Sequence, residues 1–324
     1  MTENRRLKKR VRARADKTGE SYTTALQHFR TTETGSNASR RLRIAVAQVQ
    51  SPTDPGAAEA IRHAGSTVRD LMSEAHRREA TAIHFGEGTL CAPEKRRMSS
   101  VAGAIAESDW SRFDWDGQTR ELRLIVDHAA ALGLWTVIGG VHRLTSPRRP
   151  HNSMYVIDGK GQVTCRYDER MLSFTKQSYM YTPGSRPVTF SVDGVRFGCA
   201  LGMESVYPEV FLEYERADVD CVLFSSHGPS SAFSLQVQGH AGANSLCVSY
   251  ATSCPENAVG AQSGIAGVDG NWIARCADTA EPAIALADID TGAENPARPW
   301  RREARANHRN NPLLDDPRAA DNSF

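Results

Sequence analysis

Short apolar runs suited to β-strands recur through residues 43–290, and helical segments or glycine turns separate them. The runs RIAVAQVQ and TAIHF begin the series, and the residues between them place apolar side chains at helical spacing. Later runs, such as PVTFSV and VRFGCAL, are joined across Asp193-Gly194, which is a typical hairpin turn. A chain that mixes helix-connected strands with hairpins is expected to fold as a single α/β domain with mixed, helix-covered sheets.

Charge is distributed unevenly along the 324 residues, although the formal net charge is only +1. Residues 1–40 carry ten basic and four acidic side chains, and residues 296–324 carry six and four. Subtracting these excesses of +6 and +2 from +1 leaves −7 on residues 41–295. We therefore expect a basic, partly disordered or helical appendage at 1–42, a folded domain at 43–295 and a C-terminal tail that begins at residue 296.

The composition argues against several classes of protein. No run approaches the roughly 18 apolar residues of a membrane helix, and the N-terminal stretch lacks the apolar core of a secretory signal, so we expect a soluble, cytoplasmic protein without membrane contact. The seven cysteines form no CxxC pair, and the ten histidines form no HExxH motif. No phosphate-binding glycine motif follows the first strand, so neither a metal nor another cofactor is expected.

Several motifs occur in a specific order along the body. It begins with RIAVAQ, places Glu87 after the second strand, and continues with IGG at 138–140, NSMYVIDGKGQV at 152–163 and VDGVRFGCALGMESVYPEVF at 192–211. This order and spacing resemble the nitrilase, or carbon-nitrogen hydrolase, superfamily over roughly residues 43–290. The resemblance implies a four-layer αββα sandwich that commonly assembles as a homodimer or a higher oligomer.

Members of that superfamily cleave nonpeptide amide or nitrile carbon-nitrogen bonds with a Glu base, a Lys and a Cys nucleophile. A thiol becomes a good nucleophile only when a neighbouring base takes its proton. The ammonium group of the Lys then stabilises the negative charge that develops on the substrate. Each of the three roles therefore requires a particular side chain.

The resemblance assigns one residue of this chain to each of those positions. Glu87 corresponds to the general base. Glu169 falls at the lysine position of a Tyr-x-Lys-x-x-Leu stretch that begins here at Tyr167. Gly202 falls at the cysteine position, because the acid expected two residues later is Glu204. The expected triad therefore lacks a thiol and carries an anion where the family has a cation.

Three other residues near these motifs have predicted roles. His142 lies close to the position of a further family Glu after the IGG strand, and His227 follows a strand end where family substrate contacts often occur, so both are candidate ligand-binding residues. Cys199 lies three residues before Gly202 along a strand. This odd offset turns its side chain to the opposite face, and we expect a buried core cysteine that does not replace the nucleophile.

Three functions remain open from the sequence. The first is a carbon-nitrogen hydrolase homologue, catalytically impaired or inactive, that keeps a small-molecule pocket for an amine or amide or acts as a regulator or scaffold. Two carboxylates at one cavity would favour a cation or would share a proton, with one pKa raised. The second is an active amide or nitrile hydrolase with a non-standard nucleophile. The third is a scaffold whose basic residues 1–42 contact nucleic acid or a partner protein.

Overall fold

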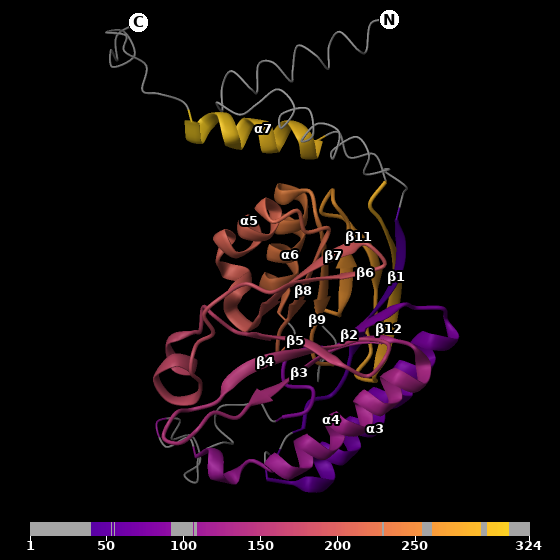
Figure 1. The fold of residues 1–324 in the computed structure, drawn as a ribbon, viewed down its shortest axis with the longest axis vertical. Coiled ribbons are helices and arrows are strands. Elements are labelled where there is room, and N and C mark those ends of the chain that lie inside the picture. The colour runs from indigo at the N-terminus through magenta and orange to yellow at the C-terminus, as the bar shows by residue number, and fades with distance from the viewer. Residues whose placement is uncertain are drawn as a thin grey trace, which may run out of the picture. The chain divides into compact units, whose positions relative to one another are not determined.

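Two six-stranded mixed sheets form the body of the protein (Figure 1). The structure is a computed structural model that describes residues 40–52, 54, 56–91, 106, 109–228, 230–254, 261–292 and 297–310. Most of the basic appendage predicted at residues 1–42, and the part of the predicted tail beyond residue 310, lie outside the described residues. No helix among the residues that the structure describes is long and apolar enough to cross a membrane.

The first sheet has the strand order β12-β1-β2-β3-β4-β5. Its centre is the parallel trio β1, β2 and β3, and antiparallel neighbours flank the trio on both sides. The strands are β1 (Arg41–Gln48), β2 (Ala82–His84), β3 (Trp135–His142), β4 (His151–Ile157), β5 (Val163–Asp168) and β12 (Ala283–Asp290).

The second sheet repeats this pattern with the order β11-β10-β9-β8-β7-β6. Here β7, β8 and β9 form the parallel trio, and their neighbours are antiparallel. The strands are β6 (Thr189–Val192), β7 (Val195–Leu201), β8 (Cys221–Ser225), β9 (Cys247–Ala251), β10 (Gly264–Ala266) and β11 (Trp272–Arg275).

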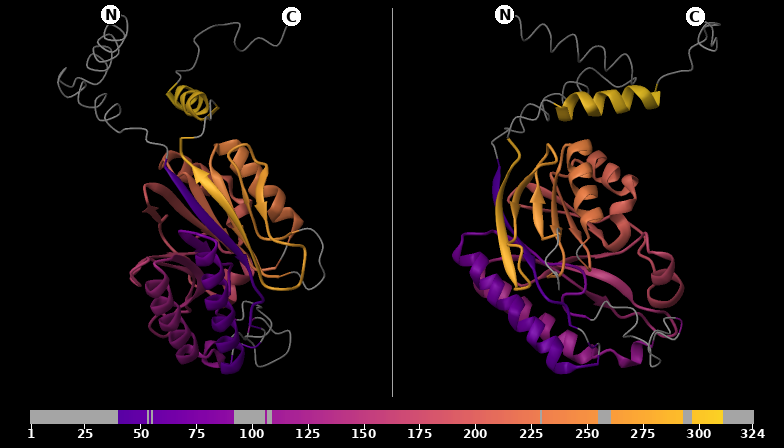
Figure 2. Two further views of the ribbon diagram at one scale, coloured as in Figure 1. Left: turned by 90° about the vertical axis from the view of Figure 1, so that its right-hand side faces the viewer. Right: turned by 180° about the vertical axis from the view of Figure 1, so that it is seen from behind.

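One pair of helices covers the outer face of each sheet, and Figure 2 shows the two pairs on opposite sides of the molecule. The apolar faces of α3 (Ala58–Arg77) and α4 (Trp115–Leu132) pack on the first sheet, and those of α5 (Pro208–Arg216) and α6 (Ser231–Asn244) pack on the second. A third apolar cluster fills the space between the sheets. The predicted four-layer αββα arrangement is therefore confirmed.

Local sequence signals explain where these elements start and stop. The Asp114 carboxylate accepts a hydrogen bond from the Gly117 amide and caps α4, which ends at Gly133 with a left-handed φ of 64°. The predicted turn between β6 and β7 has positive φ at both Asp193 and Gly194, as a tight hairpin turn requires. Cys199 is fully buried between the sheets, as its strand position predicts.

A C-terminal helix, α7 (Ala297–Asn310), occupies the first half of the predicted tail. Arg298 forms an ion pair with Asp220, and Arg302 forms one with Glu215 at the end of α5. Arg305 donates to the carbonyl oxygen of Ala243 in the last turn of α6. Because the last carbonyls of a helix attract cations, these arginines attach α7 to the folded body.

His84, the last residue of β2, links the two sheets through its imidazole. Ser225 Oγ donates to the Phe85 carbonyl oxygen, so it accepts from His84 Nε2 at 2.8 Å. His84 Nδ1 is then the acceptor for Ser249 Oγ at 3.0 Å. Both serines belong to the second sheet, and the ring is fully buried. Burial lowers the pKa of His84 to about 3, so the bridge consists of a neutral imidazole.

We expect His84→Gln to change how stability depends on pH. The unfolded chain protonates this residue near pH 6.5 and the native protein only near pH 3. Because of His84, the free energy of unfolding therefore decreases by about 1.4 kcal/mol for each pH unit below 6.5. The variant should be about 1–3 kcal/mol less stable at pH 7 because it loses hydrogen bonds. Urea unfolding should show this gap shrinking by about 2 kcal/mol near pH 5. Parallel pH profiles for the two proteins would contradict the prediction.

Candidate functional site

Polar side chains from the first sheet and from the segment after β5 meet backbone groups of the second sheet beyond the carboxyl ends of the parallel strands. Glu87 lies three residues after β2, Glu169 follows β5 directly, and Asn152 lies within β4. Lys176 begins a single π-helical turn, η4 (Lys176–Met180), and Gly202 begins the 3₁₀ helix η5 (Gly202–Val206) that follows β7. Ligand sites in open α/β sheets form at this end of the strands.

Glu87 is buried and accepts hydrogen bonds at both carboxylate oxygens. Its Oε1 lies 2.5 Å from Lys176 Nζ and 2.9 Å from Asn152 Nδ2. Its Oε2 accepts from the backbone amide of His227, just beyond β8, at 2.9 Å. The residue predicted as the general base is therefore held by one cation, one side-chain amide and one backbone amide.

Glu169 shares two of these donors. Its Oε2 lies 2.7 Å from Lys176 Nζ and 2.6 Å from Asn152 Nδ2, and its Oε1 accepts from the Met203 amide at 3.2 Å. Lys176 thus bridges the two carboxylates, and Asn152 donates to both. We call Glu87, Asn152, Glu169 and Lys176 the carboxylate cluster.

Burial and charge act in opposite directions on the pKa values in the cluster. Burial raises the pKa of Glu169 to about 7, with a contribution from the Glu87 charge, and the ammonium of Lys176 only partly offsets it. Burial also acts to raise the pKa of Glu87, but Lys176 outweighs it and the pKa is lowered. The pKa of Lys176 is raised, because the two carboxylates outweigh burial, which alone would lower it. The two carboxyl groups therefore differ in acidity although they share one lysine.

A third buried carboxylate, that of Glu204, lies between the segments that carry Glu169 and Gly202. Glu204 accepts from the Tyr167 hydroxyl at 2.6 Å, from the Leu201 amide at 2.8 Å and from the Arg170 amide at 2.8 Å. Tyr167 and Arg170 flank Glu169 in the chain, and Leu201 immediately precedes Gly202. The Glu204 side chain therefore links the end of β5 to the end of β7.

Gly202 has a backbone conformation and surroundings that suit only glycine. Its φ is +66°, in the left-handed region that side chains rarely adopt. A Cβ built there would overlap Glu169 Oε1 and Lys176 Nζ, closer than real Cβ atoms approach such atoms. The carboxylate cluster therefore fills the space into which a side chain at position 202 would project.

The glycine pair at 139 and 140 lets the Glu87 loop approach the first sheet. A Cβ on Gly139 would overlap the Gly86 carbonyl oxygen and contact the Glu87 backbone. Phe85 continues the pairing beyond β2 by donating its amide to the Val137 carbonyl oxygen at 2.8 Å. The IGG motif thus has a physical basis, because the loop that carries Glu87 passes directly over Gly139.

The structure brings together most of the residues that the sequence singled out. Glu87, Glu169 and Gly202 lie together around Lys176, and His227 contributes its backbone amide to Glu87. The His142 side chain instead bonds the Tyr155 hydroxyl and lines a separate hollow.

The structure adds to this site a cation that the sequence motifs did not indicate. Lys176 supplies an ammonium group to the same point from a segment seven residues beyond Glu169. Composition offered one signal for it: the sequence has six lysines, and only Lys160 and Lys176 follow residue 95. A buried lysine beyond residue 95 could therefore be only one of these two residues.

Comparison with known proteins gives a consistent family and fold. A family model described as Carbon-nitrogen hydrolase matches residues 43–299. No curated protein sequence matches the chain. Solved structures of an amidase from Nesterenkonia do match. A cysteine-to-alanine mutant of Nesterenkonia AN1 amidase, from the nitrilase superfamily, is 18% identical with a TM-score of 0.65, and the match covers 84% of this chain and 97% of that chain.

Two further structures of that amidase contain small amides or their products. One mutant shows covalent addition of the acetamide moiety of fluoroacetamide at its active site cysteine, with 17% identity, a TM-score of 0.64 and coverage of 85% and 97% of the two chains. Another mutant is in complex with butyramide, with 18% identity, a TM-score of 0.63 and coverage of 84% and 97%. At these identities the likeness concerns the fold.

We expect Lys176→Met to destabilise the protein by about 3–5 kcal/mol, because it leaves two buried carboxylates without their shared cation. Adding Glu169→Gln removes one of these charges and should recover at least about 1 kcal/mol of that loss. Lys160→Met, on an exposed turn, is the matched control and should change the free energy of unfolding by less than about 0.5 kcal/mol. Chemical denaturation of the four proteins measures these differences. Equal effects of the two lysine substitutions would contradict the role given to Lys176.

Proposed function

The chain belongs to the carbon-nitrogen hydrolase, or nitrilase, superfamily, and we propose that it has lost the cysteine-dependent hydrolysis of that superfamily. In this proposal the carboxylate cluster serves as a non-covalent binding centre for a small molecule. The observation that carries the proposal is the absence of a side chain at Gly202, which corresponds to the family cysteine, together with the occupation of that space by Glu169 and Lys176.

The charges around Lys176 support loss of the covalent step. An oxyanion that formed near this ammonium would compete with two carboxylates already within 2.5 and 2.7 Å of it. At an effective dielectric of about 20, an ionised carboxylate about 4 Å from the oxyanion would oppose it by roughly 4 kcal/mol. Lys176 therefore stabilises the resident anions first, and little of its charge remains for a substrate.

The same contacts favour a neutral amide over an amine as the ligand. Lys176 already occupies the place between the carboxylates that a ligand cation would take. A primary amide offers one carbonyl acceptor and two N–H donors, which match the N–H groups of Lys176 and the oxygens of Glu87. The side chains of Lys176 and Glu87 keep 8% and 4% of their surface exposed, whereas the side chain of Glu169 is fully buried.

The purified protein should not release ammonia from acetamide, acrylamide or butyramide above the buffer blank, since no thiol stands at the position of the family nucleophile. Incubation with fluoroacetamide should likewise leave the mass of the intact protein unchanged. Ammonia release that is abolished by Glu87→Ala would contradict the proposal and restore the interpretation as an active hydrolase.

Restoring both side chains of the family pattern should create activity. Glu169→Lys with Gly202→Cys removes the overlapping carboxylate and adds the thiol, and we expect measurable ammonia release from butyramide. Glu169→Lys with Gly202→Ala is the matched control, because it has the same backbone strain of about 1–3 kcal/mol without a thiol. If the cysteine variant folds and yields no more product than the alanine variant, the assignment of Gly202 to the nucleophile position fails.

An active hydrolase with a displaced nucleophile is the second candidate, and Cys91 is the buried thiol near the carboxylate cluster that could serve it. The Glu87 charge raises the pKa of this thiol and the Lys176 charge lowers it, so Cys91 lies within range of both groups. Burial acts most strongly and raises the pKa further, which disfavours the reactive thiolate. A fluoroacetamide adduct that maps to Cys91 and disappears in Cys91→Ala would support this second function over the first.

A further inference from the structure

The charges of the carboxylate cluster do not sum to zero. Glu87 and Glu169 contribute two negative charges, and the ammonium group of Lys176 contributes one positive charge. Asn152 donates to both carboxylates but carries no charge. All four side chains are buried, so water does little to stabilise the negative charge that remains. A buried site with this imbalance favours the uptake of one proton.

The surroundings of the two carboxyl groups indicate that Glu169 takes up this proton. The side chain of Glu169 is fully buried, whereas that of Glu87 keeps 4% of its surface exposed to water. Burial is the largest effect on the pKa of Glu169, and with the Glu87 charge it raises that pKa to about 7, although Lys176 acts against it. Burial acts on Glu87 as well, but Lys176 outweighs it and the pKa of Glu87 is lowered. Near pH 7, Glu169 therefore exchanges its proton while Glu87 stays ionised.

The hydrogen bonds of Glu169 determine which of its oxygens carries the proton. Its Oε2 already accepts from Lys176 at 2.7 Å and from Asn152 at 2.6 Å. Its Oε1 accepts from the Met203 amide at 3.2 Å, which is a longer contact. A proton on Oε1 therefore leaves the bonds to Lys176 and Asn152 intact. Protonation changes the charge of the cluster without requiring its side chains to move.

Lys176 connects this change of charge to a ligand. Its side chain keeps 8% of its surface exposed, whereas Glu169 is enclosed behind it. Two of its three N–H groups donate to the carboxylates, so within the described part of the chain one remains for a carbonyl oxygen. An ionised Glu169 opposes the partial negative charge of that oxygen. A neutral Glu169 removes this opposition and leaves Lys176 with a single anionic partner.

Three ionisable groups near the cluster keep one protonation state between pH 6 and pH 8. Burial raises the pKa of the Cys91 thiol and of the Tyr181 hydroxyl, and the Glu87 charge adds to both shifts, so both groups are neutral. Burial lowers the pKa of His84 to about 3, so its imidazole is neutral as well. A change of charge in this pH range therefore does not come from these three residues.

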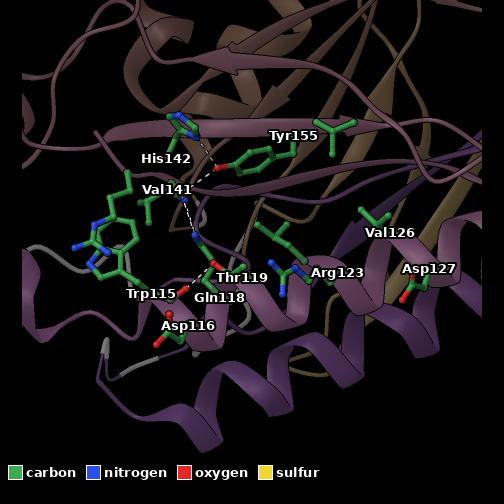
Figure 3. Close-up of a pocket in the computed structure, with 13 residues that line it drawn as sticks. Trp115, Asp116, Gln118, Thr119, Arg123, Val126, Asp127, Val141, His142 and Tyr155 are labelled. Carbon is green, nitrogen blue, oxygen red and sulfur yellow. Dashed lines mark hydrogen bonds between the residues drawn. The ribbon is translucent and has the colours of Figure 1, made fainter. Parts of the chain in front are cut away.

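Several charged or ionisable side chains nearby are directed elsewhere. His151 precedes Asn152 on β4, so the two side chains lie on opposite faces of the sheet. His142 pairs with His151 across β3 and β4 and lies on the same outer face, beside α4 (Figure 3). Asp168 and Arg170 form ion pairs with residues outside the cluster. None of these four faces the shared lysine.

Glu204 and His227 are ionisable neighbours of the cluster. Glu204 accepts from the Tyr167 hydroxyl and from backbone amides, so it has donors of its own. His227 donates its backbone amide to Glu87, and its imidazole charge is, after that of Lys176, one of the effects that lower the pKa of Glu87. Histidine side chains ordinarily titrate at about pH 6.5. The effect of His227 must therefore be measured separately from that of the proton on the cluster.

We propose that the proton on Glu169 regulates ligand binding at the carboxylate cluster. The inference rests on the function proposed above, in which Lys176 and Glu87 bind a neutral amide. A protonated Glu169 lets Lys176 donate strongly to the amide carbonyl, and an ionised Glu169 weakens that bond. Glu169 is thus a positioning residue that acts through Lys176 without touching the ligand. Amide binding strengthens as pH falls from 8 to 6.

Calorimetric titration with butyramide at pH 6 and pH 8 tests this regulation. Butyramide does not ionise in this range, so a change in its affinity belongs to the protein. With a pKa of about 7, the protonated fraction of Glu169 is roughly 0.9 at pH 6 and roughly 0.1 at pH 8. We therefore expect a dissociation constant about three- to tenfold lower at pH 6, where tenfold corresponds to binding by the protonated form alone.

Two variants identify the group that carries the proton. Glu169→Gln keeps the shape of the side chain in a neutral form, and it should bind butyramide equally at the two pH values, about as tightly as the native protein at pH 6. His227→Gln retains the backbone amide that bonds Glu87, and as the matched control it should keep the pH dependence. Titrations of the native protein in buffers of different ionisation enthalpy should also show proton uptake on binding at pH 8.

The outcomes separate this inference from the function on which it rests. Butyramide binding that changes less than about twofold between pH 6 and pH 8, or binding without proton uptake, would overturn the inference and leave the proposed function intact. A pH dependence that persists in Glu169→Gln, or one that disappears in His227→Gln, would overturn it as well. Absence of butyramide binding by the native protein at both pH values would contradict the proposed function itself, and the inference with it.

Discussion

One buried ammonium group allows the two halves of the site to meet. Glu87 belongs to the loop after β2 and Glu169 to the end of β5, and neither carboxylate is exposed enough for water to solvate its charge. Two such anions at one point repel each other strongly in a protein interior. Lys176 removes this repulsion by bonding both, and its side chain is itself buried. Glu169, compensated in this way, also accepts from the amide of Met203 next to Gly202.

The repeated pattern of the two sheets determines where such a cluster forms. Each sheet has a parallel trio at its centre, so the carboxyl ends of β2 and of β7 and β8 lie at one end of the sandwich. His84 joins these ends through serines of the second sheet, and the His227 amide reaches Glu87 from the end of β8. The cluster therefore lies at an interface between sheets, and the packing of the sandwich core holds it in place.

The sequence predicted the fold well because the signals for it are local. Periodicity, capping residues and glycine turns each act over a few residues, and the αββα arrangement followed from their order together with the family resemblance. Glu87, Glu169 and Gly202 were identified by the same motifs. Lys176 was missed because a sequence motif assigns a role to a residue at a fixed position. In the folded protein, a side chain from another segment can lie at the same point. The contacts of α7 were missed because they depend on the ends of α5 and α6.

His142 illustrates a further limit of sequence reasoning. Its position after the IGG strand suggested a contact with the ligand of the main site, but the pairing of β3 with β4 places it beside Tyr155 on the outer face. Alternation along the strand predicts only that the side chains of Val141 and His142 lie on opposite faces of the sheet. Deciding which of the two faces inward requires the packing of the helices, which no motif supplies.

The left-handed backbone at Gly202 also has an evolutionary consequence. A codon change that introduced cysteine there would create a side chain that overlaps Glu169 and Lys176. A change of Glu169 to lysine would by itself set two cations side by side with no thiol to benefit. Neither single substitution provides both a thiol and the space for it, so the loss of cysteine-dependent hydrolysis that we propose could be reversed only by changing both positions. Under that proposal, the occupied space beside Gly202 blocks a return to the family chemistry along single-substitution paths.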